Sequence, residues 1–392
     1  MKQSSKIKTE KSTIIVLAAA AVVFFAALFC IYSKDFLNGT ADIFNSGEDE
    51  LVEFEKATVT EILSEEMEAD KVADGAYKGT QEFKAIVKSG RYKGEKMIVY
   101  NYFGPLSGVP VSKGDSVTIT IKTQPSGEHS ATVYEFNRIP ILAAFLLLFF
   151  IVIVLVGGRT GLKSLVGLII TVICLFAILI PLLLKGAPTI PTTFFICCFI
   201  ALVCFAILGG VHRKTISAFL GTVSGAFLAM VLGIAVQFFA KIDGLRLEDA
   251  EPLLQLKYAG APIGLKGLLV AGIIISALGA VMDVAMSISS ALEEVHAANP
   301  TLSRNELFKS GMNIGRDMAG TMTNTLILAF LGSEFTLIIF LYSRGLSFYH
   351  LYSTAFVALE TISGLSASIG MILAIPLTAL ISATLIVGSK KK

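Results

Sequence analysis

The sequence predicts a mainly α-helical, polytopic membrane protein with about eight transmembrane helices and one small exported all-β domain after the first helix. Three observations predict this fold class. Hydrophobic residues make up 54% of the 392 residues and charged residues only 16%, so the excess apolar surface must face lipid. The apolar residues gather in runs of about 20, the length that crosses a bilayer. Between the first and second runs, apolar and polar residues alternate as they do in strands.

The apolar runs give eight candidate spans. They are residues 13–33, 139–157, 162–184, 189–210, 216–240, 265–287, 318–342 and 364–388. Lysines precede the first run, as they do in a signal peptide, but the run is long for a cleaved signal and no small-x-small site follows it. We therefore expect a retained signal anchor.

Basic residues in the short loops predict the orientation of the spans. Arg159, Lys163, Arg213 and Lys214 fall on the same side as the N-terminal lysines. The short loops of the other side hold fewer basic residues, and acidic residues offset most of them. We expect a multi-pass protein of the bacterial cytoplasmic membrane, with both termini in the cytoplasm and the β segment outside it.

The expected organisation has five parts. They are a cytoplasmic N-terminus (1–12), the anchor helix (13–33), the exported β domain (34–138), a seven-helix membrane domain (139–389) and a basic cytoplasmic tail (390–392). The β domain contains the alternating runs "EFKAIVKS", "EKMIVYNY", "SVTITIKT" and "SATVYEFN", with turn residues between them. Four or five short strands suit a small barrel, with an OB-like barrel as one candidate. The acidic stretch "SEEMEADK" before them is interpreted as a helical or flexible lead-in.

Composition argues against several function classes. A net charge of +2 gives no reason to expect a nucleic-acid partner. The four histidines lie far apart, without metal-ligand spacing, so neither a metal nor another cofactor is expected. Walker, zinc-protease and nucleophile-elbow motifs are absent, and no enzyme activity is expected. The expected partner is the lipid bilayer.

Two polar stripes enter the sixth and seventh predicted spans. The segment "GAVMDVAMSISSALEEV" places Asp283, Ser287, Ser290 and Glu294 at i, i+4, i+7 and i+11, on one helical face. The segment "SGMNIGRDMAGTMTNTLILAFLG" repeats this spacing with Asn313, Asp317, Gly320 or Thr321, and Asn324. Arg316 and Thr323 are further candidates for the polar pathway, and Gly311, Gly315 and Gly320 are small residues for helix packing. Because consecutive spans are usually neighbours, we expect the two stripes to face each other.

These stripes have two interpretations. An Asp at the centre of a lipid-exposed helix costs about 2.5–3.5 kcal/mol, so both stripes should avoid lipid. Ser, Thr and Asn are ordinary hydrogen-bonding groups between packed membrane helices. The ionisable Asp283, Arg316 and Asp317 instead favour a hydrated pathway for an ion, a proton or a small solute.

Five segments together resemble the YibE/F family of bacterial integral membrane proteins. They are "GGRTGLKSLVGLIITV", "GGVHRKTISAFLGT", "MDVAMSISSALEEV", "SGMNIGRDMAGTMTNTLILAFLG" and "SIGMILAIPLTALI". The β segment ahead of them is similar to the longer, YibE-type members. The resemblance implies a transporter without an assigned substrate, and a second YibE/F membrane protein or a second copy of the chain as partner.

The expected function is that of a permease or ion-coupled transporter. In this hypothesis Asp283 and Asp317 accept a proton or coordinate a cation, and Arg316 tunes their charge. A non-transporting scaffold, whose β domain recruits another protein, is the alternative. A third hypothesis, an intramembrane hydrolase using both aspartates, matches no known motif.

Overall fold

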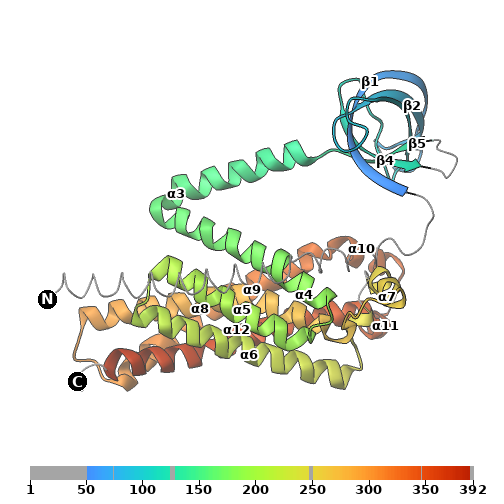
Figure 1. The fold of residues 1–392 in the computed structure, drawn as a ribbon. Coiled ribbons are helices and arrows are strands. Elements are labelled where there is room, and N and C mark those ends of the chain that lie inside the picture. Colours follow the sequence, from blue (N-terminus) through green and yellow to red (C-terminus); the bar gives the residue numbers. More distant parts are fainter. Residues whose placement is uncertain (1–50, 74, 124–128, 247–249, 346, 389–392) are drawn as a thin grey trace. The chain divides into compact units, whose positions relative to one another are not determined.

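The computed structural model describes residues 51–388 except 74, 124–128, 247–249 and 346 (Figure 1). The predicted N-terminus, anchor helix and basic tail lie outside the described residues. The described chain forms two compact units, one ending at Val152 and the other beginning at Ile153.

The first unit is a closed five-stranded barrel. Its strands are β1 (Leu51–Ala69), β2 (Tyr77–Val87), β3 (Lys96–Phe103), β4 (Ser116–Thr123) and β5 (His129–Phe136). They close in the order β1-β2-β3-β5-β4, with β3 and β5 parallel and the other pairs antiparallel. This is the strand order of an OB-fold, so the expected small β barrel is confirmed.

Strand alternation builds the core of the barrel. Phe83, Ala85 and Val87 on β2 and Ile119 and Ile121 on β4 are fully buried, because every second side chain of a strand points to the same face. On β2 the residues between them are more accessible, with Lys84 exposed and Ile86 half-buried. The barrel therefore has a hydrophobic core of its own.

The interpretation of "SEEMEADK" as a helical or flexible lead-in is wrong. Residues 64–69 of this stretch form the end of β1 and pair with β2, and only Asp70 and Lys71 lie beyond the strand. Lysines on β2 supply counter-charges, since Glu61 pairs with Lys84 at 2.9 Å and Glu68 with Lys78 at 3.7 Å. Register shifts between Val59 and Ser64 interrupt the pairing of β1 with β2. Such irregularities increase strand bending, which suits a strand that must also reach β4.

A long apolar helical segment follows the barrel. Helix α3 (Ile139–Ile173), the π-helical turn η1 (Cys174–Leu179) and α4 (Ile180–Leu184) form 46 continuous residues. A straight helix of that length would measure about 69 Å, more than twice the hydrocarbon thickness. At Gly158 the backbone leaves helical geometry, with φ 53° and ψ −131°. This break lies between the predicted spans 139–157 and 162–184.

The second unit also contains five longer helices. They are α5 (Thr189–Gly209), α6 (Arg213–Ala240), α8 (Leu268–Ala298), α9 (Arg304–Ser333) and α12 (Ala355–Val387). Short elements connect them: η2 (Gly244–Arg246), α7 (Ala250–Tyr258), η3 (Leu265–Gly267), α10 (Phe335–Ser343) and α11 (Phe348–Ser353). Helix α8 packs against α5, α6, α9 and α12, and α12 also packs against α6 and α9.

Within the described residues, five helices are long and apolar enough to cross a membrane, or six if α9 and α10 form one bent span. The count of eight is therefore not confirmed. The span expected at 318–342 is not a single helix, because α9 begins at Arg304, ends at Ser333 and meets α10 at 63°. Ser303 and Glu306 form a capping box that fixes the early start of α9.

Small residues bring the helices of the second unit close together. A Cβ atom at Gly225 of α6 would lie 2.6 Å from the Cβ of Ala374 on α12 and 2.7 Å from Val281 on α8. The hydroxyls of Ser289 on α8 and Ser382 on α12 lie 3.0 Å apart in the buried interior. Close backbone approach and polar contacts of this kind are typical of membrane helix packing.

Candidate functional site

Helix α8 exposes a continuous face of small and polar residues. We define the α8 polar face as Gly272, Ser276, Gly279, Asp283, Ser287, Ser290 and Glu294, all of them exposed or half-exposed. These positions follow the 3.6-residue period of a helix and share one side. Between Leu268 and Glu294, no large apolar side chain of α8 is fully exposed, and Ile275, Met282 and Met286 are half-buried. Its apolar residues, such as Ile274, Val281 and Ile288, are buried against the neighbouring helices.

Sequence reasoning found only the second half of this face. Gly272, Ser276 and Gly279 continue the predicted stripe towards the start of α8 at the same spacing. The helical spacing of these three residues was visible in the sequence, but two of them are glycines, which are not recognised as part of a polar stripe. With these residues the face runs from Gly272 to Glu294, a rise of about 33 Å along the helix axis, which is close to the thickness of a bilayer core.

Helix α9 carries a second face of the same kind. We define the α9 polar face as Asn313, Arg316, Asp317, Gly320, Thr321 and Asn324, which are all exposed. Thr323 lies at its edge, half-buried, and its hydroxyl has no hydrogen-bond partner. Beyond Thr325 the exposed side chains of α9 become apolar, beginning with Ile327. The α9 polar face is therefore confined to the first two thirds of the helix.

The packed contact between α8 and α9 uses other residues. A Cβ at Gly311 would lie 3.0 Å from Leu292 on α8 and 2.9 Å from Ala379 on α12. Gly315 approaches Ile288 and Ile375 in the same way. Gly320 has open space around it. The structure thus places Gly311 and Gly315 between helices, whereas both polar faces lie on exposed surface.

The charged groups of the polar faces are unpaired. Among the described residues, Asp283, Arg316 and Asp317 form no hydrogen bond or ion pair. Beside them, Glu293 of α8 pairs with Lys214 of α6 at 3.5 Å. The ionisable side chains of the two faces are therefore free to meet water, an ion or another chain.

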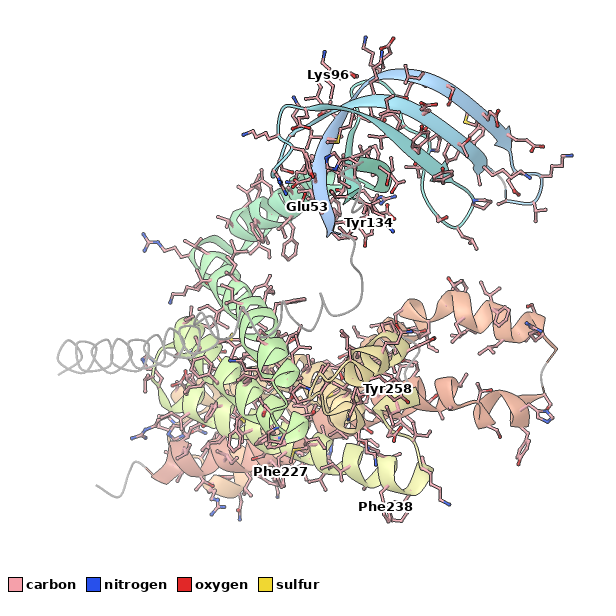
Figure 2. The ribbon with its side chains drawn as sticks, turned by 45° about the vertical axis from the view of Figure 1, so that its right-hand side comes forward. Glu53, Lys96, Tyr134, Phe227, Phe238 and Tyr258 are labelled. Carbon is pink, nitrogen blue, oxygen red and sulfur yellow. The ribbon has the colours of Figure 1, made fainter. Side chains whose placement is uncertain are left out.

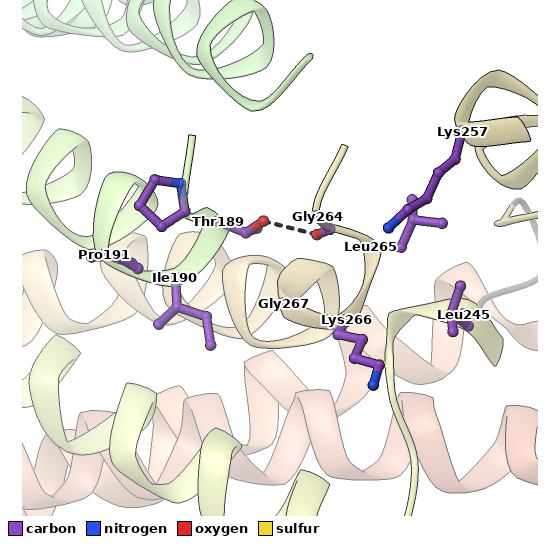
Figure 3. A pocket seen from close by; sticks show the side chains of 10 residues that line it. Thr189, Ile190, Pro191, Leu245, Lys257, Gly264, Leu265, Lys266 and Gly267 are labelled. Atoms are coloured by element: carbon purple, nitrogen blue, oxygen red, sulfur yellow. Dashed lines mark hydrogen bonds between the residues drawn. The ribbon is translucent and has the colours of Figure 1, made fainter. Parts of the chain in front are cut away.

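A cavity of about 410 Å³ lies where α8 begins (Figure 3). The Thr189 hydroxyl, at the start of α5, donates a 2.8 Å hydrogen bond to the Gly264 carbonyl and holds the two walls together. Figure 3 shows the Lys257 side chain reaching from α7 towards Leu265. Gly272 of the α8 polar face follows little more than one helical turn after Gly267, which lines the cavity.

Comparisons with known proteins address the helical part of the chain. No curated protein and no solved structure shows significant similarity to the sequence. The model of one family, described as YibE/F-like protein, matches residues 145–388, which include both polar faces and the cavity. Because this match covers more than half of the chain, the protein belongs to the YibE/F-like family.

Proposed function

We propose that the protein is a permease or ion-coupled transporter of the bacterial cytoplasmic membrane, and that its α8 and α9 polar faces line the transport route. One observation carries this proposal. Helix α8 is apolar enough to cross a membrane, yet its fully exposed side chains over about 33 Å are all small or polar.

The chemistry of the α8 polar face makes contact with lipid unfavourable. A lipid-facing surface is built from large apolar side chains, which glycine and serine do not supply. Asp283 adds a cost of about 2.5–3.5 kcal/mol if it meets lipid near the bilayer centre. Water or protein is therefore the better neighbour for this face.

Each polar group has a role in the proposed route. Asp283 and Asp317 bind a proton or a cation, and Arg316 balances their negative charge. Ser287, Thr321, Thr323 and Asn324 offer oxygen and amide groups along the way. In the proposed orientation both termini are cytoplasmic, which puts Asp283 and Asp317 in the cytoplasmic half of the membrane.

The rival function is that of a scaffold, with the polar faces covered by a second copy or another membrane protein. The exposed Gly272 and Gly279 favour this alternative, because a Cβ at either position has no atom within 4 Å. Such glycines are common where another helix packs closely. The two functions differ in whether water reaches the α8 polar face.

Thiol accessibility distinguishes the two. Single cysteines are introduced at Gly272, Gly279 and Ser287 in a chain whose five native cysteines are replaced by serine or alanine, and are treated with a small aqueous thiol reagent in membranes. If the α8 polar face lines a transport route, the reagent should label the cysteines at all three positions. Cysteines at Val231, on the exposed apolar face of α6, and at buried Ala277 are the controls and should stay unlabelled. Protection of all three polar-face cysteines would reject the route and support the scaffold.

A further inference from the structure

The outer face of the barrel carries two exposed tyrosines beside polar side chains. Tyr100 and Tyr102 follow each other on the outward side of β3 and are 43% and 65% exposed. Across the sheet, Tyr100 is opposite Glu82 on β2, which is opposite Ser64 on β1. Thr80 is opposite Tyr102. We call these five residues the tyrosine patch.

A shallow cavity of about 150 Å³ lies in the tyrosine patch. All five patch residues line it, together with Gln81 and Asn101. Protein pockets for drug-sized ligands usually measure about 300–1,000 Å³, so this cavity suits a fragment such as a single sugar ring. The two tyrosines lie about 6.6 Å apart along the strand, which allows successive rings of one chain to contact both.

The polar groups of the tyrosine patch have no partners within the described chain. None of the five side chains forms a hydrogen bond or an ion pair there. The neighbouring carboxylates do have partners, since Glu61 and Glu68 bind lysines and Glu65 accepts a 2.8 Å hydrogen bond from Gln81. Two carboxylates of this surface region are thus left available to a ligand: the half-buried Glu82, and the exposed Glu66, which lies opposite Thr80.

A buried network holds the strands beneath the tyrosine patch in place. The Asn101 amide donates to Gln81 at 3.1 Å and to the Val109 carbonyl at 3.0 Å. Gln81 also donates to the Val111 carbonyl at 3.0 Å and accepts from the Val111 backbone N–H at 2.9 Å. Gln81 and Asn101 are 3% and 1% exposed, so this network is rigid and ties β2 and β3 to the following loop. Rigid support lowers the entropic cost of binding a ligand.

From this arrangement we propose that the tyrosine patch binds an oligosaccharide. The apolar C–H face of a pyranose ring stacks on Tyr100 or Tyr102, because an aromatic ring offers a flat apolar surface with a polar edge. The hydroxyls of the sugar donate to Glu82 and exchange hydrogen bonds with Ser64 and Thr80. A nucleic acid is a poor fit, because its phosphates require lysine or arginine. The one charged side chain among the five patch residues is the carboxylate of Glu82.

The test measures binding to the full-length chain in detergent by calorimetry. The probes are hexamers of β-1,4-linked N-acetylglucosamine and β-1,4-linked glucose. The wild-type chain should bind at least one of them, and Tyr100→Ala and Tyr102→Ala should each weaken that binding at least tenfold. Tyr100→Phe and Tyr102→Phe keep the aromatic ring and should change the binding affinity less than threefold.

Tyr134→Ala is the matched control, because Tyr134 is a 61% exposed tyrosine of the same barrel outside the patch (Figure 2). The Tyr134→Ala variant should bind the hexamers as tightly as the wild type does. The proposal is overturned if neither hexamer binds, if Tyr134→Ala weakens binding as much as Tyr102→Ala, or if a single-stranded oligonucleotide or an unstructured peptide binds more tightly than both sugars. A melting curve of each variant separates lost binding from lost folding.

Discussion

Helices α6 and α8 pack against each other and have nearly equal mean hydropathy, yet they arrange their residues in opposite ways. Helix α6 exposes Ile216, Phe227, Val231 and Phe238 and buries glycine, alanine, serine and threonine. Figure 2 shows Phe238 projecting away from the neighbouring helices. Helix α8 buries its large apolar residues and exposes small and polar ones. Hydropathy thus identifies a span, but only the direction of each side chain shows what the span faces.

The largest expected effect of this difference is on activity. Asp283→Asn keeps the volume of the side chain but removes its titratable group, and Asp317→Asn does the same on α9. We expect each variant to lose at least 100-fold in proton or cation flux, measured in proteoliposomes with a pH-sensitive or ion-sensitive dye. Expression and melting temperature should stay close to those of the wild type, since an exposed amide replaces an exposed carboxylate. Wild-type flux in both variants would refute an ion-coupled mechanism.

A second test places the same charge on each helix. Val231→Asp puts a carboxylate on the exposed apolar face of α6 and should cost about 2.5–3.5 kcal/mol of insertion free energy. Gly279→Asp adds it to the α8 polar face and should cost less than half as much, because a Cβ there has open space and polar neighbours. The membrane-inserted fraction of each variant measures the cost. Equal insertion costs for the two variants would show that the exposed faces of α6 and α8 are in contact with the same environment.

A third test compares two glycines. Gly225→Leu forces a side chain between α6, α8 and α12, where the Cβ alone would lie 2.6 Å from Ala374, and should destabilise the protein by about 1–3 kcal/mol. Gly272→Leu meets no atom within 4 Å of its Cβ and should leave stability unchanged while reducing flux. Thermal unfolding in detergent, together with the flux assay, separates the two effects. If Gly272→Leu unfolds the chain, α8 has a neighbour in the assembled protein.

The smallest expected effect concerns the ion pair that joins the two helices. Glu293→Gln removes the partner of Lys214, which lies 3.5 Å away at a partly exposed position. Such pairs contribute about 0–1 kcal/mol, and salt screens them. The melting temperature should therefore fall by only a few degrees at low ionic strength and by less in high salt. A large loss at both salt concentrations would instead indicate a buried, structural pair.

The sequence predicted helix positions well where the residues themselves end a span. Spans 189–210 and 216–240 correspond closely to α5 and α6, because Gly210 and Lys241 interrupt the apolar runs. The bend after Ser333 could not be settled from the apolar run 318–342, which continues through the end of α9 into α10 with Glu334 as its one charged residue. In the barrel, strand alternation was visible, but the acidic half of β1 was not recognised as a strand. Its pairing with Lys78 and Lys84, which lie 10 and 23 residues from their glutamate partners, depends on the fold of the barrel.

The candidate site was predicted in part. Asp283 and Asp317 stood out because charge is rare in apolar runs, and their helical spacing identified the faces. Which side of each helix is packed could not be read from that spacing. The packed side of α9 is set by Gly311 and Gly315, whose neighbours Leu292 and Ile375 come from two other helices. For the same reason, only the fold places Tyr100, Glu82 and Ser64 in one row.

The pairing of β1 has a consequence for how the protein is made. The first residues of β1 pair with the last residues of β4, Leu51 opposite Thr123, and β5 follows later still. Contacts so distant in sequence form slowly, and the barrel cannot close before the chain as far as Thr123 has been synthesised. Under the proposed topology, this delay keeps the barrel open while its first strands pass through the secretion channel. The same late closure would make the barrel fold only once it is on the far side of the membrane.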